Sequence, residues 1–169
     1  MAYFEHEGCT LHYEEYGHGA PLILIHGLGS SCLDWELQVP VLSQHYWLIV
    51  VDVRGHGRSD KPRERYSIAG FTDDLVALIE HLQLPPAHVV GLSMGGMIAF
   101  QLAVDEPQML KSLCIVNSAP QVKVRTAGDY WQWAKRWSLA RVLSLSTIGK
   151  ALGTMLFPKP EQAELRRFP

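Results

Sequence analysis

The sequence predicts an α/β protein with a doubly wound, mostly parallel sheet. Short apolar runs rich in valine, isoleucine and leucine alternate along the chain with longer segments whose apolar residues recur every three or four positions. Most of these runs are continuous, which is typical of strands buried on both faces of a parallel sheet. Strands separated by helices in this order indicate a doubly wound arrangement of about six strands.

The N-terminal elements follow from the same patterns. Residues 10–17 alternate apolar and polar side chains and end in glycine, as an edge strand or one arm of a hairpin does. Continuous apolar runs predict buried strands within residues 21–27 and 46–55. Apolar residues at helical spacing lie between these strands, where Pro40 is expected to cap or kink any helix.

The clearest helix is expected over residues 67–84, where two consecutive prolines stop it. A strand over residues 87–93, a helix over 94–107 and a strand over 111–119 complete the alternation. The predicted core stripe of the first of these helices consists of Phe71, Leu75, Leu78, Ile79 and Leu82.

The pattern divides the chain into two regions. Residues 1–120 carry the α/β alternation and predict the core, whereas residues 121–169 show helical periodicity without a further strand. The first region holds 6 basic and 14 acidic residues, and the second holds 9 and 3. Because the basic residues of the second region alternate with Trp and Leu at helical spacing, we interpret them as the solvent-exposed face of amphipathic helices and expect no nucleic-acid partner.

Composition excludes other classes of protein. The apolar runs are far shorter than the roughly 20 residues that span a bilayer, and the N-terminus lacks the features of a signal peptide. Neither a membrane partner nor secretion is therefore expected, and the predicted location is the cytoplasm. The three cysteines, Cys9, Cys32 and Cys114, include no C-x-x-C pair, so reduced thiols and no metal site are expected.

A G-x-S-x-G motif joins an expected strand to an expected helix. Gly91 and Gly95 flank Ser93 at two-residue spacing. A sharp strand-to-helix turn with flanking glycines lifts a serine hydroxyl above a sheet and places a helix N-terminus beneath it. The motif therefore predicts that Ser93 is a nucleophile. A glycine-rich turn without chemistry is the alternative.

A second turn, at residues 26–29, supplies the groups that such a nucleophile needs. Acyl transfer creates an oxyanion that requires two preorganised donors. The backbone amide of Met94 is one candidate, and the amide of Leu28, between Gly27 and Gly29, is the other. His26 precedes this turn at a strand end, so a structural hydrogen bond to the turn is expected of it rather than the role of a base.

These motifs resemble those of the α/β-hydrolase superfamily. The segments HGLGSS, DVRGHGRSD and GLSMGG occur in the order typical of the serine hydrolases in its carboxylesterase, enol-lactonase and cofactor-free haloperoxidase-like branch. The resemblance implies an oxyanion hole at the amides of Leu28 and Met94, the nucleophile Ser93 and no cofactor. Asp52 and Arg54, in the second segment, are expected to pair with each other.

The sequence departs from this family after the nucleophile. The family order is serine, acid, histidine, yet no histidine follows Ser93. The resemblance implies a sheet of about eight strands, of which about six are expected here. We therefore expect the chain to be the N-terminal two-thirds of a hydrolase of roughly 260 to 280 residues. The missing C-terminal segment, or a second chain, would cover the apolar edge formed by residues 111–119.

The expected function is hydrolysis of a small-molecule carboxylic ester, thioester or lactone through an acyl-enzyme. The resemblance implies that residues 121–169 are a truncated segment of a helical cap. Within it, Trp131, Trp133 and Trp137 are candidates for lining the substrate pocket, although packing between the cap helices would explain most of them. Two alternatives stay open: carbon–carbon bond hydrolysis or perhydrolysis at the same turn, and a non-catalytic binding module. Since the acid and the histidine are absent, little or no activity is expected of these residues alone.

Overall fold

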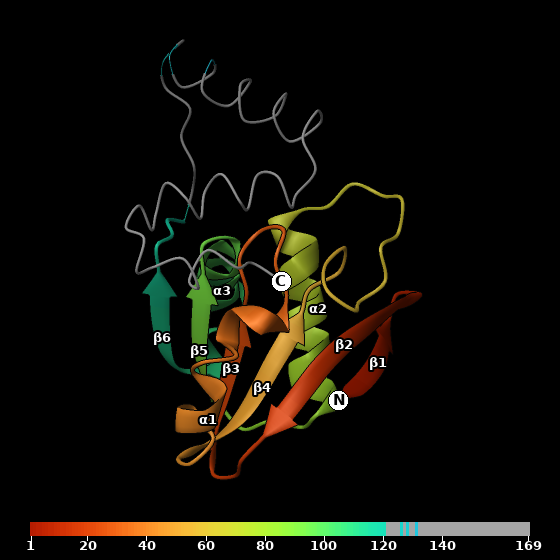
Figure 1. Ribbon diagram of the computed structural model, residues 1–169. Helices are drawn as coiled ribbons and strands as arrows, with labels where there is room; N and C mark the ends of the chain where they lie inside the picture. The colour runs from red at the N-terminus through yellow and green to blue at the C-terminus, as the bar shows by residue number, and fades with distance from the viewer. Residues whose placement is uncertain (121–125, 127, 129–130, 132–169) are drawn as a thin grey trace, which may run out of the picture. The chain divides into compact units, whose positions relative to one another are not determined.

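The computed structural model describes residues 1–120 together with residues 126, 128 and 131 (Figure 1). The chain divides into two compact units, Met1–Val122 and Lys123–Pro169. The elements below all belong to the first unit.

A six-stranded mixed sheet forms the centre of this unit, with the strand order β1-β2-β4-β3-β5-β6 (Figure 1). The pairs β3–β4, β3–β5 and β5–β6 are parallel, whereas β1–β2 and β2–β4 are antiparallel. The prediction of a mostly parallel sheet of about six strands is therefore confirmed. The strands are β1 (Ala2–His6), β2 (Cys9–Tyr16), β3 (Ala20–Ile25), β4 (Tyr46–Asp52), β5 (Ala87–Leu92) and β6 (Leu110–Val116).

β2 is one arm of a hairpin, which was one of the two predictions for this segment. It is not an edge strand, because it lies between β1 and β4. The edge strand on this side of the sheet is β1, which pairs with β2 and is connected to it by a two-residue loop. Both loop residues, Glu7 at φ 49° and Gly8 at φ 71°, have positive φ, as the tight turns that suit the twist of paired strands require.

The helices start at or next to the predicted residues but end two or three residues early: the helix expected to reach residue 84 ends at His81, and the one expected to reach residue 107 ends at Asp105. In α2 (Ile68–His81), the Ser67 hydroxyl accepts a hydrogen bond from the Gly70 amide at 3.0 Å, which satisfies one of the unpaired donors at the helix start. Pro40 lies in the first turn of a short helix, where the missing N–H costs nothing. The remaining helical elements are η1 (Cys32–Trp35), α1 (Val39–Leu42), α3 (Met94–Asp105) and η2 (Pro107–Met109).

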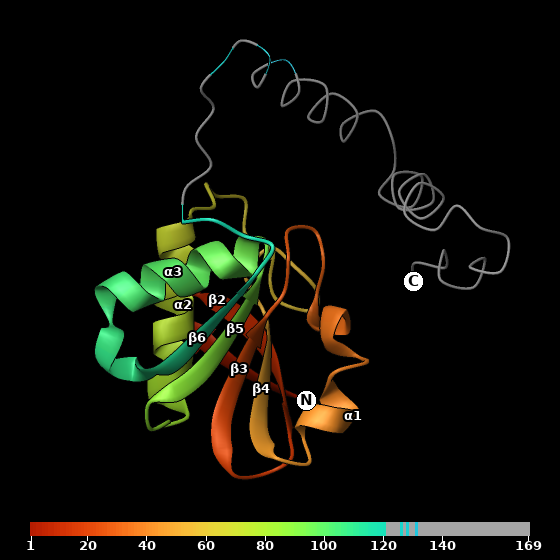
Figure 2. The same cartoon turned by 90° about the vertical axis from the view of Figure 1, so that its left-hand side faces the viewer.

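Helices cover both faces of the sheet. Figure 2 shows α2 and α3 on one face and α1 on the other. The larger core lies beneath α2 and α3, where Ile49, Leu78 and Ile98 are fully buried. On the opposite face, Trp35 packs against Leu24 and neighbouring strand residues.

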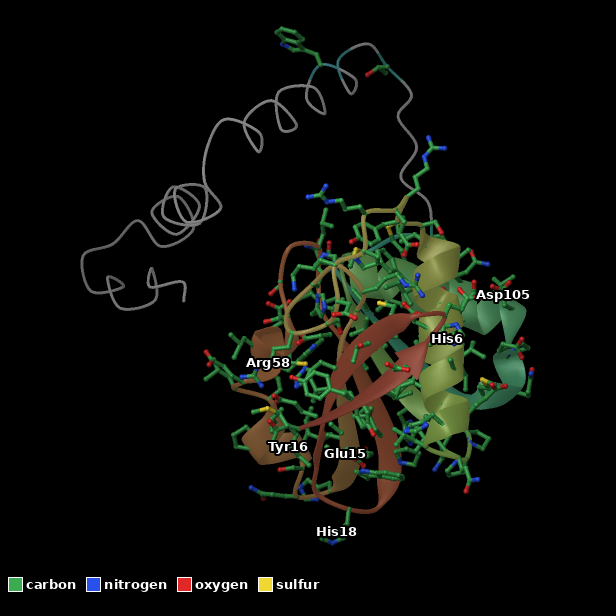
Figure 3. The ribbon with its side chains drawn as sticks, turned by 90° about the vertical axis from the view of Figure 1, so that its right-hand side faces the viewer. His6, Glu15, Tyr16, His18, Arg58 and Asp105 are labelled. Carbon is green, nitrogen blue, oxygen red and sulfur yellow. The ribbon has the colours of Figure 1, made fainter. Side chains whose placement is uncertain are left out.

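The four parallel strands place their carboxyl ends at one edge of the sheet, where open α/β sheets bind ligands. The segments that follow these ends contain His26, Val53, Ser93 and Ser118. His18 lies at the tip of the turn between β2 and β3, at the opposite edge (Figure 3). His18 is therefore remote from the edge that carries Ser93.

Candidate active site

The G-x-S-x-G segment forms the sharp turn between β5 and α3. Ser93 has φ 51° and ψ −110°, a conformation that costs energy for a residue with a side chain. Strain of this kind is concentrated at functional sites. The Ser93 amide donates a hydrogen bond to the Val116 carbonyl oxygen at 2.9 Å. The end of β6 therefore helps to hold the strained turn.

The two glycines of the motif allow backbone segments to approach the turn. A Cβ atom at Gly91 would lie 2.3 Å from the Gly95 carbonyl oxygen, and a Cβ at Gly95 would lie 2.3 Å from the Ile25 carbonyl oxygen. Both obstacles are backbone atoms, which cannot rotate away. The start of α3 therefore lies directly against the end of β3, as residues without side chains permit.

His26 is fully buried at the end of β3. The Val53 amide donates a hydrogen bond to His26 Nε2 at 3.2 Å, so Nδ1 carries the proton and donates to the Gly27 carbonyl oxygen at 2.7 Å. Burial lowers the pKa of His26, in keeping with a neutral ring. Both ring nitrogens are engaged in hydrogen bonds, which is the structural role expected of this residue.

The hydrogen bond from His26 also orients the amide of Leu28. All described peptide bonds are trans, so the Gly27 carbonyl and the Leu28 N–H point in opposite directions from one planar group. Fixing the carbonyl oxygen of Gly27 at 2.7 Å from His26 Nδ1 therefore fixes the direction of the Leu28 N–H.

The turn at residues 26–29 and the Ser93 turn are neighbours. A Cβ atom at Gly27 would lie 3.7 Å from Ser93 Cβ. Gly29, at φ 75°, adopts a conformation that favours glycine, while the Leu28 side chain is 74% exposed. Met94 is buried and begins α3, where the first amides of a helix lack partners within the helix. The structure thus brings together Ser93 and both amide-bearing turns.

The expected pairing of Asp52 with Arg54 is wrong. Arg54 instead reaches α2, where its Nε and Nη2 donate to the two carboxylate oxygens of Asp74 at 2.6 and 2.5 Å. Its Nη1 donates to Glu64 at 2.7 Å. The two-pronged geometry of the guanidinium suits one carboxylate on a facing element better than a neighbour two residues away.

Asp52 ties three segments together instead. Its carboxylate accepts hydrogen bonds from the Cys32 amide at 2.6 Å, from the Arg58 amide at 2.9 Å and from His12 Nδ1 at 2.8 Å. Burial opposes ionisation of Asp52, but the hydrogen bonds from the two amides and from the Cys32 and His12 side chains together outweigh it and lower its pKa. A Cβ at Gly57 would lie 2.2 Å from this carboxylate, so the loop after β4 wraps tightly around it.

His12, Cys32 and Asp52 form the one close group of metal-ligating side chains in the part of the chain that the structure describes. Zinc would require the thiolate of Cys32, but burial raises the pKa of this thiol. The Asp52 oxygens already accept hydrogen bonds from backbone amides. These three side chains therefore suit a hydrogen-bonded structural cluster rather than a cation site.

Of the three tryptophans proposed for a pocket, only Trp131 is described, and its side chain is 63% exposed. Trp133 and Trp137 lie outside the described residues. Among the described helices, none is both long and apolar enough to cross a membrane.

The comparisons with known proteins agree with this architecture. The family model described as alpha/beta hydrolase fold matches residues 20–146. The chain belongs to the α/β hydrolase fold family. The α/β hydrolase 3-oxoadipate enol-lactonase 2 of Acinetobacter baylyi is 32% identical over 153 residues, which cover 89% of this chain and 55% of that relative.

Solved α/β hydrolases give the same result. A protein described as an N-acyl homoserine lactone degrading enzyme is 40% identical, with a TM-score of 0.68 over 69% of this chain and 45% of that one. The enol-lactonase from Burkholderia xenovorans is 28% identical, with a TM-score of 0.77 over 90% of this chain and 58% of that one. This α/β hydrolase chain thus spans about half the length of the relatives that it matches.

Proposed function

We propose that this chain carries the nucleophile and the oxyanion hole of a serine hydrolase acting on a carboxylic ester, a thioester or a lactone. The observation that carries the proposal is the strained backbone of Ser93, at φ 51°, beside a turn whose Leu28 amide is oriented by a buried neutral histidine. Such strain without chemistry would only destabilise the fold.

In the proposed reaction, Ser93 Oγ attacks the substrate carbonyl carbon and gives its proton to a general base. The carbonyl electrons move onto oxygen, and the amides of Leu28 and Met94 stabilise the resulting oxyanion. Donors of this kind contribute about 3 kcal/mol each in measured cases. Collapse of the intermediate expels the alcohol, thiol or ring oxygen, which takes the proton back from the base. The base then deprotonates water, which attacks the acyl-enzyme, and Ser93 Oγ recovers a proton as the carboxylic acid leaves.

The general base is not assigned to a residue of this chain, because no histidine follows Ser93. The shared region covers 55% of one matched relative and 45% of another. Polypeptide beyond residues 1–169 is therefore proposed as the source of the acid and the base.

Lactones are the favoured substrate class within this proposal. Two of the matched relatives are named as an enol-lactonase and an N-acyl homoserine lactone degrading enzyme. Carbon–carbon bond hydrolysis is the second candidate, since a meta-cleavage product hydrolase is 31% identical over 66% of this chain. Analysis of the products from a lactone and from a dienoate substrate separates the two.

The direct test is intact-mass measurement of the 19.0 kDa chain during incubation with a fluorophosphonate. Without its base the enzyme is expected to react slowly, yet the oxyanion hole alone leaves a rate about a thousandfold above the uncatalysed one. A single adduct is expected, and Ser93→Ala removes it. Labelling no faster than that of the urea-unfolded chain contradicts the proposal.

Ser112 provides a matched control. Its hydroxyl lies 2.6 Å from His88 Nδ1, so it is a second serine with an adjacent histidine. Unlike Ser93, it lies within a regular strand, β6. Ser112→Ala should leave the adduct unchanged. If the adduct disappears in Ser112→Ala and persists in Ser93→Ala, then Ser112 rather than Ser93 is the reactive serine, and the proposal is refuted.

A further inference from the structure

We propose that Asp34 is a positioning residue that holds the turn at residues 27–30 in the shape that presents the Leu28 amide to the oxyanion. This inference rests on the proposed function, since it assigns the group that supports one of the two proposed donors.

Asp34 contacts both ends of this turn. One carboxylate oxygen, Oδ2, accepts a hydrogen bond from the Gly27 amide at 3.1 Å, and the other, Oδ1, accepts one from the Ser30 hydroxyl. The Ser30 amide in turn donates to the Gly27 carbonyl oxygen at 3.3 Å. The turn is thus closed on itself and clamped at each end by one side chain.

The clamp leaves the middle of the turn available. Among the contacts of the described residues, the N–H groups of Leu28 and Gly29 have no hydrogen-bond acceptor, whereas the Gly27 N–H is occupied by Asp34. Of the two, the Leu28 N–H is the one whose direction is fixed through the Gly27 carbonyl oxygen. An unpaired N–H in the middle of a turn whose ends are fixed is a preorganised donor, and preorganisation is what gives an oxyanion hole its effect.

Asp34 is itself held by the scaffold. It lies in η1, which is anchored at its start by the hydrogen bond from the Cys32 amide to Asp52 at 2.6 Å. The end of η1 is anchored by Trp35, which is buried against the sheet. A carboxylate on a fixed element holds the turn more firmly than the glycine-rich segment could hold itself.

Both partners in the turn donate to Asp34, and a carboxylate offers acceptors on both oxygens. An asparagine could keep the acceptor for the Gly27 amide and donate its NH₂ group to the Ser30 hydroxyl, which also accepts hydrogen bonds. Removal of the clamp therefore requires a side chain without polar atoms, as in Asp34→Ala. The carboxylate is also close to the reaction: a Cβ at Gly27 would lie 3.8 Å from Asp34 Oδ2 and 3.7 Å from Ser93 Cβ.

The experiment compares the full chain with Asp34→Ala, Asp34→Glu and the control Glu36→Gln, which changes an exposed carboxylate just after η1. The first readout is hydrogen exchange of the individual amides by NMR. In Asp34→Ala, the Gly27 amide should exchange at least about tenfold faster, while the Val53 amide, which is bonded to His26, keeps its wild-type rate.

The second readout is the rate of fluorophosphonate labelling at Ser93. Asp34→Ala should lower it by about 10- to 100-fold, less than the loss of a whole donor, and Asp34→Glu, which keeps both acceptor oxygens, should recover part of the rate. Glu36→Gln should match the wild type. Rescue by glutamate is the readout that a purely structural role would not produce.

Wild-type exchange at Gly27 in Asp34→Ala, or a labelling rate within twofold of the wild type, overturns the inference. Faster exchange at Val53 as well as Gly27 means general loosening of the fold, and it also overturns the inference. If the wild type shows no labelling that depends on Ser93, the proposed function fails instead, and the exchange rates alone decide whether Asp34 holds the turn.

Discussion

The buried ion pair between Arg54 and Asp74 makes a quantitative prediction about stability. Asp74→Asn keeps the shape of the side chain but leaves the guanidinium, whose side chain is 10% exposed, with Glu64 as its remaining charged partner. Breaking a buried pair by removing one partner costs about 3 to 5 kcal/mol. Because asparagine still accepts one hydrogen bond, we expect a loss of about 3 kcal/mol in the free energy of unfolding.

Glu64→Gln is the matched control, because it removes a charge from the same arginine at a side chain that is 45% exposed rather than 6%. Exposed ion pairs contribute about 0.2 to 1 kcal/mol, so this variant should lose less than about 1 kcal/mol.

Urea denaturation followed by tryptophan fluorescence measures both variants. With a slope of about 2 kcal/mol per molar urea, Asp74→Asn should lower the midpoint by about 1.5 M and Glu64→Gln by less than about 0.5 M, at unchanged slope. Equal shifts for the two variants, or a larger shift for Glu64→Gln, would show that burial of the pair is not what gives Asp74 its importance.

Three further predictions concern the site. Gly95→Ala should destabilise the fold by about 2 kcal/mol, because the added Cβ would lie 2.3 Å from the Ile25 carbonyl oxygen. The control is Gly70→Ala, where the atom nearest to the added Cβ is the Ser67 hydroxyl oxygen at 3.3 Å; this variant should change the urea midpoint little. Ser118→Ala removes the hydrogen bond from its hydroxyl to the Ser93 carbonyl oxygen at 2.5 Å and should cost about 1 kcal/mol in the same assay; an unchanged midpoint would mean that the other donors to this oxygen suffice. Burial lowers the pKa of His26, so the unfolded state binds the proton more readily, and stability should fall with pH below about 6.5 by up to about 1.4 kcal/mol per pH unit. A His26→Asn variant should lose that part of the pH dependence, and midpoints that fall equally in both proteins would contradict the assignment.

The strands that are buried on both faces could be predicted from the sequence, because burial of this kind leaves long runs of valine, isoleucine and leucine. β1 could not be predicted in this way, because it has no continuous apolar run. Its burial alternates along only five residues, and it becomes a strand by pairing with β2 through a tight turn. Local sequence carries little of that information.

The site shows the same division. The glycines around Ser93 predict the strained turn, because only glycine tolerates the backbone approach that this turn requires. The partners of Arg54 and Asp34 could not be predicted in this way. Asp74 follows Arg54 by 20 residues on a separate helix, and Asp34 reaches Gly27 only because η1 folds back over the turn. Such contacts depend on tertiary packing, which residue spacing does not record.

The hydrogen bond between the Ser93 amide and the Val116 carbonyl oxygen has a consequence for the order of folding. The turn at Ser93 is local in sequence, but its support arrives only when the chain has crossed over through α3 and β6 has aligned parallel to β5. Parallel pairings are non-local and form slowly. The reactive geometry of Ser93 should therefore appear late during refolding, and the time at which the serine becomes susceptible to a fluorophosphonate would report the docking of β6.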